Sequence, residues 1–259
     1  MLWRCHADSV GLFLSNTFFH FKQFSITAQE SGLKVGTDAC LLGAYAEHDE
    51  PEHCLDIGTG TGVVALFLAQ KYPESKTIAI ELEPTVYRQA LKNISESPFS
   101  KRIQPVEGDF MNFQSELKFD LIVCNPPYFN KSLQKQNSPL NRAIHNLGMP
   151  MDGLLAQVST LLNESGRFWI IYPPYEAGIL LEKATAVGLH IHRIVQIFNK
   201  PGKHFRTLLC FQKAVIANPL LSDLQMHDAD GSRTEAFRLL MLPFYLENTE
   251  KYKRQHRES

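Results

Sequence analysis

The chain has 259 residues, 44% of them hydrophobic, with 26 basic and 27 acidic side chains and a formal net charge of −1. This length and composition provide one substantial core, and the balanced charge excludes attraction to nucleic acid by the molecule as a whole, so such contact needs a local basic patch. Five cysteines form no C-x-x-C pair, which favours reduced thiols in a cytoplasmic protein and indicates no metal site. No apolar run reaches membrane-spanning length, and charged residues interrupt the first fifteen positions, so neither membrane contact nor a signal peptide is expected.

Strand-like and helix-like runs alternate through the middle of the chain. Strand patterns are predicted at 53–57, 77–81, 102–107, 119–124, 168–172, 190–198 and 205–213. Helical patterns are predicted at 63–71, 85–96, 152–162 and 176–187. The alternation predicts an α/β fold with a mostly parallel twisted sheet and helices on both faces. The last two strands, joined by residues 199–202, should form a hairpin that contributes an antiparallel edge strand.

A glycine-rich turn follows the first of these strands. Gly58, Gly60 and Gly62 alternate with threonines between a strand pattern and a helical pattern. In this arrangement the backbone approaches a nucleotide-like ligand closely, because glycine has no Cβ to block it. Asp56 leads the turn. The spacing differs from the G-x-G-x-x-G of dinucleotide-binding proteins, so a dinucleotide is not the first choice.

Acidic residues also follow the next two strands. Glu81 ends the second strand, where a carboxylate would accept hydrogen bonds from ribose hydroxyls; Glu83 is the alternative, although it is more typical of a helix start. Asp109 follows the third strand where an adenine would lie, and Phe110 offers a ring or a backbone N–H beside it. The alternative for Asp109 is a turn aspartate that bonds its own backbone. Since parallel strands end at one edge of a sheet, all these residues should share one rim.

The motif Asn125-Pro126-Pro127-Tyr128 comes directly after the fourth strand. The side-chain oxygen of Asn125 and the carbonyl of Pro126 can accept hydrogen bonds from an NH2 group, and Tyr128 can stack on the plane that carries it. Pro127 fixes the turn, and Phe129 would form the opposite wall. The motif therefore predicts a site for a planar amino group. The alternative is a rigid turn with a buried tyrosine.

Together with Lys34-Val35-Gly36-Thr37-Asp38, these motifs resemble the bacterial tRNA (adenine-N6)-methyltransferases that act on valine tRNA, over roughly residues 19–213. The resemblance implies a Rossmann-like methyltransferase fold, S-adenosyl-L-methionine as cofactor, and transfer to N6 of an adenine, most specifically adenine 37 next to the anticodon. The catalytic residues would be Asn125, Pro126 and Tyr128. The cofactor would be held by Lys34, Gly36, Thr37, Asp56, Gly58, Gly60, Gly62, Glu81, Asp109, Phe110 and Asn125.

The residues and the resemblance together predict four segments. Residues 1–18 would be an extension, and 19–50 would close over the methionine end of the cofactor. Residues 51–215 would form the methyltransferase domain, and 216–259 a C-terminal segment with a basic tail, all within one globular unit. The basic residues at 251–257 favour a solvated tail over an RNA-contacting arm.

Two groups of basic residues suggest where RNA would bind. Lys131 and Arg142 follow the acceptor motif, and Lys203 and Arg206 lie at the terminal hairpin. These basic residues would contact the phosphates of the anticodon stem-loop, and Pro127 and Phe129 would contact the adenine. Surface cations more often serve solubility, and residues 141–145 are a looser version of the arginine-rich stretch of the family.

Other functions remain open on the sequence. The acceptor motif is shared with protein glutamine N5-methyltransferases and with DNA adenine methyltransferases, and an rRNA adenine is a further possible acceptor. The glutamine enzymes carry a sizeable helical domain before the glycine turn, whereas only about fifty residues precede Asp56. A DNA enzyme would usually need a separate target-recognition region. A cofactor-binding RNA chaperone without catalysis is the alternative from another class, and the intact motif argues against it. The sequence predicts no oligomeric state.

Overall fold

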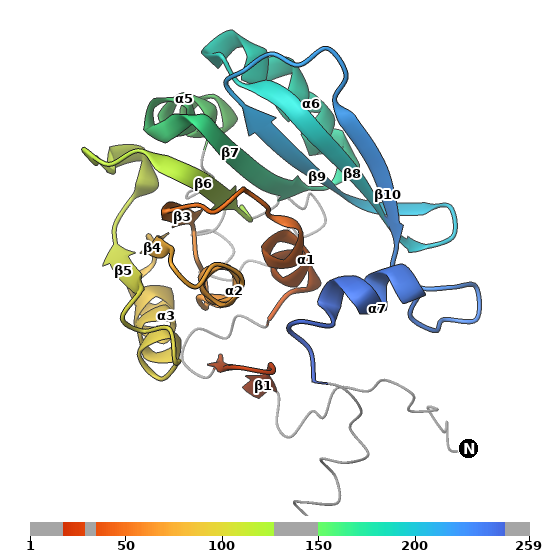
Figure 1. Ribbon diagram of the computed structural model, residues 1–259, viewed down its shortest axis with the longest axis horizontal. Helices are drawn as coiled ribbons and strands as arrows, with labels where there is room; N and C mark the ends of the chain where they lie inside the picture. The colour runs from red at the N-terminus through yellow and green to blue at the C-terminus, as the bar shows by residue number, and fades with distance from the viewer. Residues whose placement is uncertain (1–17, 29–34, 127–149, 247–259) are drawn as a thin grey trace, which may run out of the picture.

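The computed structural model describes residues 18–28, 35–126 and 150–246, and the following account concerns these ranges. A central sheet has the strand order β10-β8-β9-β7-β6-β3-β4-β5 (Figure 1). Strands β3 to β7 pair in parallel with their neighbours in this set. The strands are β3 (His53–Ile57), β4 (Lys76–Glu81), β5 (Ile103–Glu107), β6 (Phe119–Cys124), β7 (Leu162–Tyr172), β8 (His190–Lys200), β9 (Lys203–Gln212) and β10 (Leu220–Gln225).

Helices cover both faces of the sheet, as predicted (Figure 1). One face carries α1 (Thr37–Tyr45), α2 (Val63–Lys71), α3 (Pro84–Ser95) and α7 (Glu235–Met241). The other carries α5 (Met151–Leu161) and α6 (Pro174–Ala184), with the short 3-10 helices η1 (Phe110–Asn112) and η3 (Thr185–Val187). Strand β6 shows why both faces are apolar, because Leu121 and Val123 face the first core while Ile122 and Cys124 face the second. A strand buried on both faces becomes a continuous apolar run.

The terminal hairpin is present, but the prediction that it supplies an edge strand is wrong. Strand β9 lies inside the sheet, antiparallel to both β7 and β8, with Thr207 opposite Tyr172 and Phe211 opposite Phe168. Residues Leu208 to Phe211 are buried on both faces, which is typical of an internal strand. The edge is β10, which runs parallel to β8 and which the sequence did not reveal. Most of its side chains are exposed, with Leu224 as the buried exception.

A short antiparallel hairpin near the N-terminus packs against the residues that follow α7, because Phe21 bridges to Tyr245 and the Lys22 N–H donates to the Phe244 carbonyl. Its strands are β1 (Phe18–His20) and β2 (Ser25–Thr27). The ring of Phe67 in α2 stacks on Phe244 at 4.1 Å between centroids and meets Phe21 edge-on at 5.0 Å. The two ends of the described chain are therefore joined through one aromatic cluster over α2.

The four cysteines in the described ranges are buried, as predicted, and form no disulfide with one another. They are Cys40, Cys54, Cys124 and Cys210. Within the same ranges, no helix combines the length and apolar character needed to cross a membrane.

Candidate active site

The parallel strand registers bring the predicted residues to one edge of the sheet. Ile57 at the end of β3 lies opposite Cys124 at the end of β6 and Ile80 near the end of β4, and Glu81 lies opposite Glu107 at the end of β5. The glycine turn, Glu81, Asp109 and Asn125 come at or just after these ends. They therefore share the carboxyl rim of four adjacent strands, which is where ligands bind in open α/β sheets.

The glycine turn adopts a conformation that other residues rarely reach. Gly58, Gly60 and Gly62 have φ angles of 65°, 60° and 86°. A Cβ on Gly58 or Gly60 would meet no other atom of the described chain within 4 Å, whereas one on Gly62 would touch Ile94 in α3. Glycine is therefore required at the first two positions by backbone conformation rather than by crowding within the protein. The open side of the turn leaves room for a ligand to lie against the backbone.

Asp56 stabilises the turn from within. Its side chain is 1% exposed, and Oδ2 accepts hydrogen bonds from the Thr59 hydroxyl at 2.6 Å and the Ala65 backbone N–H at 3.1 Å. Burial raises the pKa of this carboxyl to about 7, although the two hydrogen bonds act in the opposite direction. Asp56 thus connects the end of strand β3 to the first turn of α2.

Glu81 also contacts the turn directly. Its Oε2 accepts from the Gly60 backbone N–H at 2.9 Å, and Oε1 accepts from the Glu83 N–H at 3.0 Å. Burial raises the pKa of the Glu81 carboxyl. Glu83 is the N-cap of α3, in agreement with the expectation that it starts a helix. The carboxylate proposed for the ribose is therefore already oriented by two backbone groups.

Asp109 is the N-cap of the short helix η1. Its Oδ1 accepts from the Met111 backbone N–H at 2.9 Å, and Oδ2 accepts from the Asn112 side chain at 3.1 Å. Phe110 is 2% exposed and belongs to the second core. The contacts of Asp109 thus match the alternative of a turn aspartate. The buried ring of Phe110 leaves its backbone as the group that can face a ligand.

The acceptor motif is described only in its first half. Asn125 follows β6 and is partly exposed, and Pro126 is buried. The remaining motif residues and several predicted contacts lie outside the described residues, namely Pro127, Tyr128, Phe129, Lys131, Arg142 and Lys34.

The start of α1 is tied to the terminal hairpin. Gly36 is the N-cap of α1 and Thr37 its first residue, and both are exposed. The next residue, Asp38, forms an ion pair with Arg206 of β9, with 2.8 Å between Oδ2 and Nε. Arg206, predicted as a phosphate contact, is therefore engaged within the protein. Lys203 at the start of β9 is exposed.

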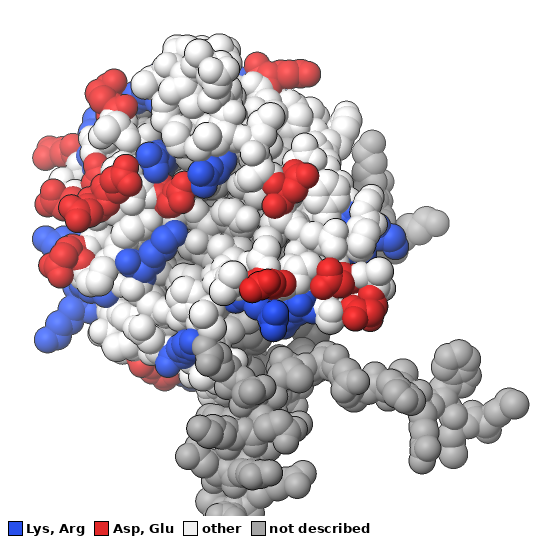
Figure 2. Space-filling model, turned by 45° about the vertical axis from the view of Figure 1, so that its right-hand side comes forward, with Lys and Arg blue, Asp and Glu red and all other residues white. Residues whose placement is uncertain are grey.

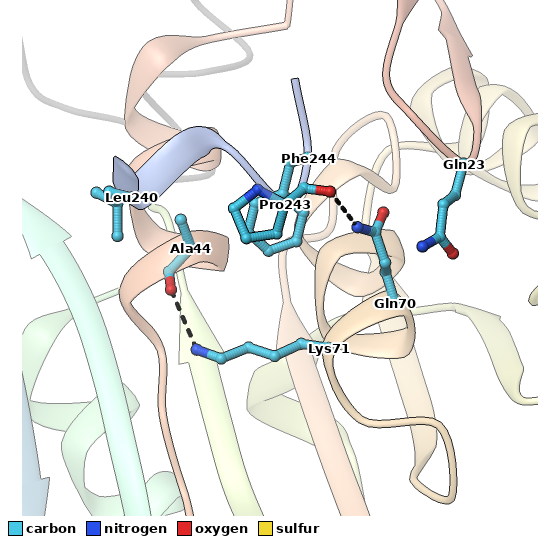
Figure 3. A pocket seen from close by; sticks show the side chains of 7 residues that line it. All are labelled: Gln23, Ala44, Gln70, Lys71, Leu240, Pro243 and Phe244. Carbon is cyan, nitrogen blue, oxygen red and sulfur yellow. Dashed lines mark hydrogen bonds between the residues drawn. The ribbon is translucent and has the colours of Figure 1, made fainter. Parts of the chain in front are cut away.

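A separate cavity of about 520 Å³ lies beside the C-terminal end of α2 (Figure 3). Its lining residues are Gln23, Ala44, Gln70, Lys71, Leu240, Pro243 and Phe244. Lys71 donates to the carbonyl oxygens of Ala44 at 3.1 Å and Ala46 at 2.7 Å, and Gln70 donates to that of Pro243 at 2.8 Å. Because α2 begins at the glycine turn, this cavity lies at the opposite end of that helix from the rim.

On the face shown in Figure 2, basic and acidic side chains are interspersed, and the described residues form no continuous basic stripe there. Across the three described ranges, His, Cys, Asp and Glu side chains form no group of three that could hold a metal ion.

Comparison with known proteins identifies the class. The model of the Methyltransferase small domain family matches residues 30–177. The crystal structure of a predicted O-methyltransferase from Agrobacterium tumefaciens superposes with a TM-score of 0.63 at 19% identity, covering 80% of this chain and 96% of that one. Fold and family match together define a Rossmann-like methyltransferase, as expected from the sequence.

Curated relatives identify the family within that class. A relative from Actinobacillus pleuropneumoniae is 40% identical over 229 residues, covering 88% of this chain and 97% of its own. A relative from Bacteroides thetaiotaomicron is 37% identical over 238 residues, covering 90% and 99%. Both are named tRNA1(Val) (adenine(37)-N6)-methyltransferase. The chain belongs to this family.

Proposed function

We propose that this protein transfers the methyl group of S-adenosyl-L-methionine to the exocyclic N6 of an adenine in tRNA, and specifically to adenine 37 beside the anticodon of valine tRNA. The observation that carries the proposal is the meeting of the glycine turn, Glu81 and Asn125-Pro126 at one rim of the sheet. The substrate named for the relatives supports the choice of acceptor. The cytoplasm, where tRNA is modified, is the proposed location.

The rim suits an adenosine-containing cofactor. Gly58 and Gly60 expose backbone with no Cβ in the way, and the oriented carboxylate of Glu81 can accept from ribose hydroxyls. The Phe110 backbone beside Asp109 would meet the adenine, and Asp56 would act by holding the turn. When bound, S-adenosyl-L-methionine supplies a methyl group on a sulfonium centre.

Residues 19–50 would close over the methionine end of the cofactor, with Lys34, Gly36 and Thr37 nearest to it. The exposed Gly36 and Thr37 at the start of α1 support this assignment, because the N-terminus of a helix presents unpaired N–H groups. These donors suit the carboxylate of the methionine moiety.

The acceptor motif would activate the adenine nitrogen. The lone pair of this nitrogen is delocalised into the ring, so the nitrogen is a poor nucleophile. Asn125 Oδ1 and the Pro126 carbonyl would accept hydrogen bonds from its two hydrogens and draw it toward tetrahedral geometry, and these bonds become strongest as positive charge develops. Tyr128 would stack on the base for in-line attack, with Pro127 fixing the turn and Phe129 forming the second wall.

The methyl transfer requires no side chain that acts as a general base. A nitrogen–carbon bond would form as the sulfur–carbon bond breaks, and the cofactor would leave as a neutral thioether, S-adenosylhomocysteine. The methylated nitrogen then loses a proton to water, because that proton becomes acidic only after methylation. We therefore assign no histidine or aspartate to proton removal.

The anticodon stem-loop would lie against the same rim. A base in an unstacked loop is extruded at small cost. The exposed Lys203 supports a phosphate contact at the hairpin, and Lys131 and Arg142 would contribute from the other side. Arg206, which is paired with Asp38, would orient α1 rather than reach the RNA.

The experiment is incubation of the protein with labelled S-adenosyl-L-methionine and total RNA from a bacterium that lacks the corresponding enzyme, followed by nucleoside analysis. Label in N6-methyladenosine of valine tRNA is expected. A valine tRNA transcript with guanine at position 37 is the matched substrate control and should remain unlabelled. Label in protein would select the glutamine alternative, label in DNA or rRNA would change the acceptor, and the absence of label would favour a binding module.

A further inference from the structure

A buried amide joins the glycine turn to the N-terminal hairpin. Asn93 in α3 is 1% exposed. Its Nδ2 donates to the carbonyl oxygen of Thr61, in the glycine turn, at 2.8 Å and to that of Thr27, the last residue of β2, at 3.0 Å. Its Oδ1 accepts from the Thr27 backbone N–H at 2.9 Å. One side chain thus bonds two backbone segments that lie far apart in sequence.

The amide takes the place of a neighbouring strand. By bonding both the N–H and the C=O of Thr27, Asn93 makes the two contacts that a paired strand would make. The Thr27 hydroxyl also donates to Asn93 Oδ1 at 3.2 Å and accepts from Gln89, which is fully buried, at 2.7 Å. Buried backbone groups are costly when left without partners, so this position demands a side chain with both a donor and an acceptor.

The glycine turn is held at three consecutive residues by side chains from three different elements. Asp56 of β3 bonds Thr59, Glu81 of β4 bonds Gly60, and Asn93 of α3 bonds Thr61. Asn93 differs from the carboxylates because it also bonds a residue of the N-terminal hairpin.

We infer that Asn93 is a positioning residue that fixes the glycine turn relative to the N-terminal segment, the two parts of the chain proposed to hold the cofactor. The inference rests on the proposed function. Without this amide, the Thr61 carbonyl loses its partner and the turn loses its connection to β2. Cofactor binding then has to order both parts, which lowers affinity. Within the described residues, the side chain of Asn93 bonds Thr27, Thr61 and Gln89, none of which is proposed to contact tRNA, so the KM for tRNA and kcat should change little.

The test is the dissociation constant for S-adenosyl-L-methionine, measured by calorimetry on Asn93→Ala and on a matched control. Asn163→Ala is that control, because its amide donates to Asp120 at the opposite end of the sheet. Asn93→Ala removes the bonds to Thr61 and to Thr27 together, and it should weaken binding about tenfold or more. Asn163→Ala should keep the wild-type constant. Thr27→Val, which removes the hydroxyl but keeps the three backbone contacts of Asn93, should fall between them.

Several outcomes decide the matter. Equal affinity of Asn93→Ala and wild type overturns the inference while the proposed function stands. A wild-type chain that does not bind S-adenosyl-L-methionine overturns the proposed function and the inference with it. If Asn93→Ala does not fold, amide exchange in the wild-type protein gives the answer. Added cofactor should then slow exchange at Thr27 more than at His53, whose N–H bonds Asp120 away from the rim, and equal slowing would overturn the inference.

Discussion

Arg206 and Asp38 form an ion pair that joins strand β9 to the first turn of helix α1. The distance from Nε to Oδ2 is 2.8 Å, and the side chains are 19% and 14% exposed. The guanidinium also lies 4.0 Å from the centre of the Phe205 ring. Asp38 Oδ1 is buried without a hydrogen-bond partner, which makes the carboxylate dependent on this arginine.

Arg206→Ala should therefore destabilise the protein. Removing one partner of a largely buried pair leaves an uncompensated charge, and we expect the free energy of unfolding in urea to fall by about 2 to 3 kcal/mol. Lys203→Ala, at an exposed position of the same hairpin, should leave that value unchanged while lowering the slope of log affinity for tRNA against log salt by about one. A reduced salt slope with unchanged stability for Arg206→Ala would instead assign Arg206 to a phosphate.

Asp56 should make stability depend on pH. Burial raises its pKa to about 7 from an ordinary value of 3.8, so the folded state binds the proton more tightly than the unfolded state. The contribution of Asp56 to the free energy of unfolding therefore falls as pH rises from about 4 to about 7 and is constant above that. Asp56→Asn keeps an acceptor for Thr59 and Ala65 but does not titrate. Its free energy of unfolding relative to wild type should therefore rise by roughly 2 to 4 kcal/mol as pH rises from about 4 to about 7. Parallel stability curves for the two proteins would show that the carboxyl does not titrate there.

Glu81→Ala should weaken the binding of S-adenosyl-L-methionine by about tenfold or more, since it removes both the proposed ribose acceptor and the Gly60 contact. Glu81→Gln keeps an acceptor for Gly60 and should lie between wild type and Glu81→Ala. Glu83→Ala is the control, because Glu83 acts as the N-cap of α3. Calorimetry that found Glu81→Ala unchanged and Glu83→Ala weakened would move the ribose contact to Glu83.

Asn125→Ala should lower kcat about 100-fold at saturating cofactor, because it removes one of two acceptors that act most strongly in the transition state. Tyr128→Ala should act mainly on base positioning and raise the KM for tRNA. Thermal unfolding of each variant checks that the fold is kept. Near-normal methyl transfer by both variants would refute the assignment of the acceptor site.

The local pattern of apolar residues was sufficient to predict the elements at the centre of the fold. Strands β3 and β6 and helix α2 have the predicted bounds, because residues buried on both faces give long apolar runs with clear ends. Strand β10 was missed, since five of its six side chains are at least partly exposed. Helix α1 was missed because its residues 39 to 44 are all buried, so no polar face marks a helical period.

The sequence could place a site residue only where that residue comes directly after the end of a predicted strand. The rim formed by Gly58, Glu81 and Asn125 follows from strand ends alone. Contacts between distant side chains had no local signal, as with Arg206 and Asp38, which are 168 positions apart, and Asn93 and Thr27, which are 66 apart. The sequence carried one hint for Asn93, because an amide at this position falls on the same side of the helix as the apolar Ala90 and Ile94.

The internal position of β9 has a consequence for the order in which the sheet is completed. Strand β9 lies between β8 and the parallel strands β3 to β7, and β8 lies between β9 and β10. During synthesis the first five strands of the sheet can pair as they emerge, whereas β8 has no neighbour until β9 follows it. We therefore expect β8 and β9 to form a hairpin first and to add to β7 as one unit, so that the pairing of Arg206 with Asp38 is among the last native contacts to form.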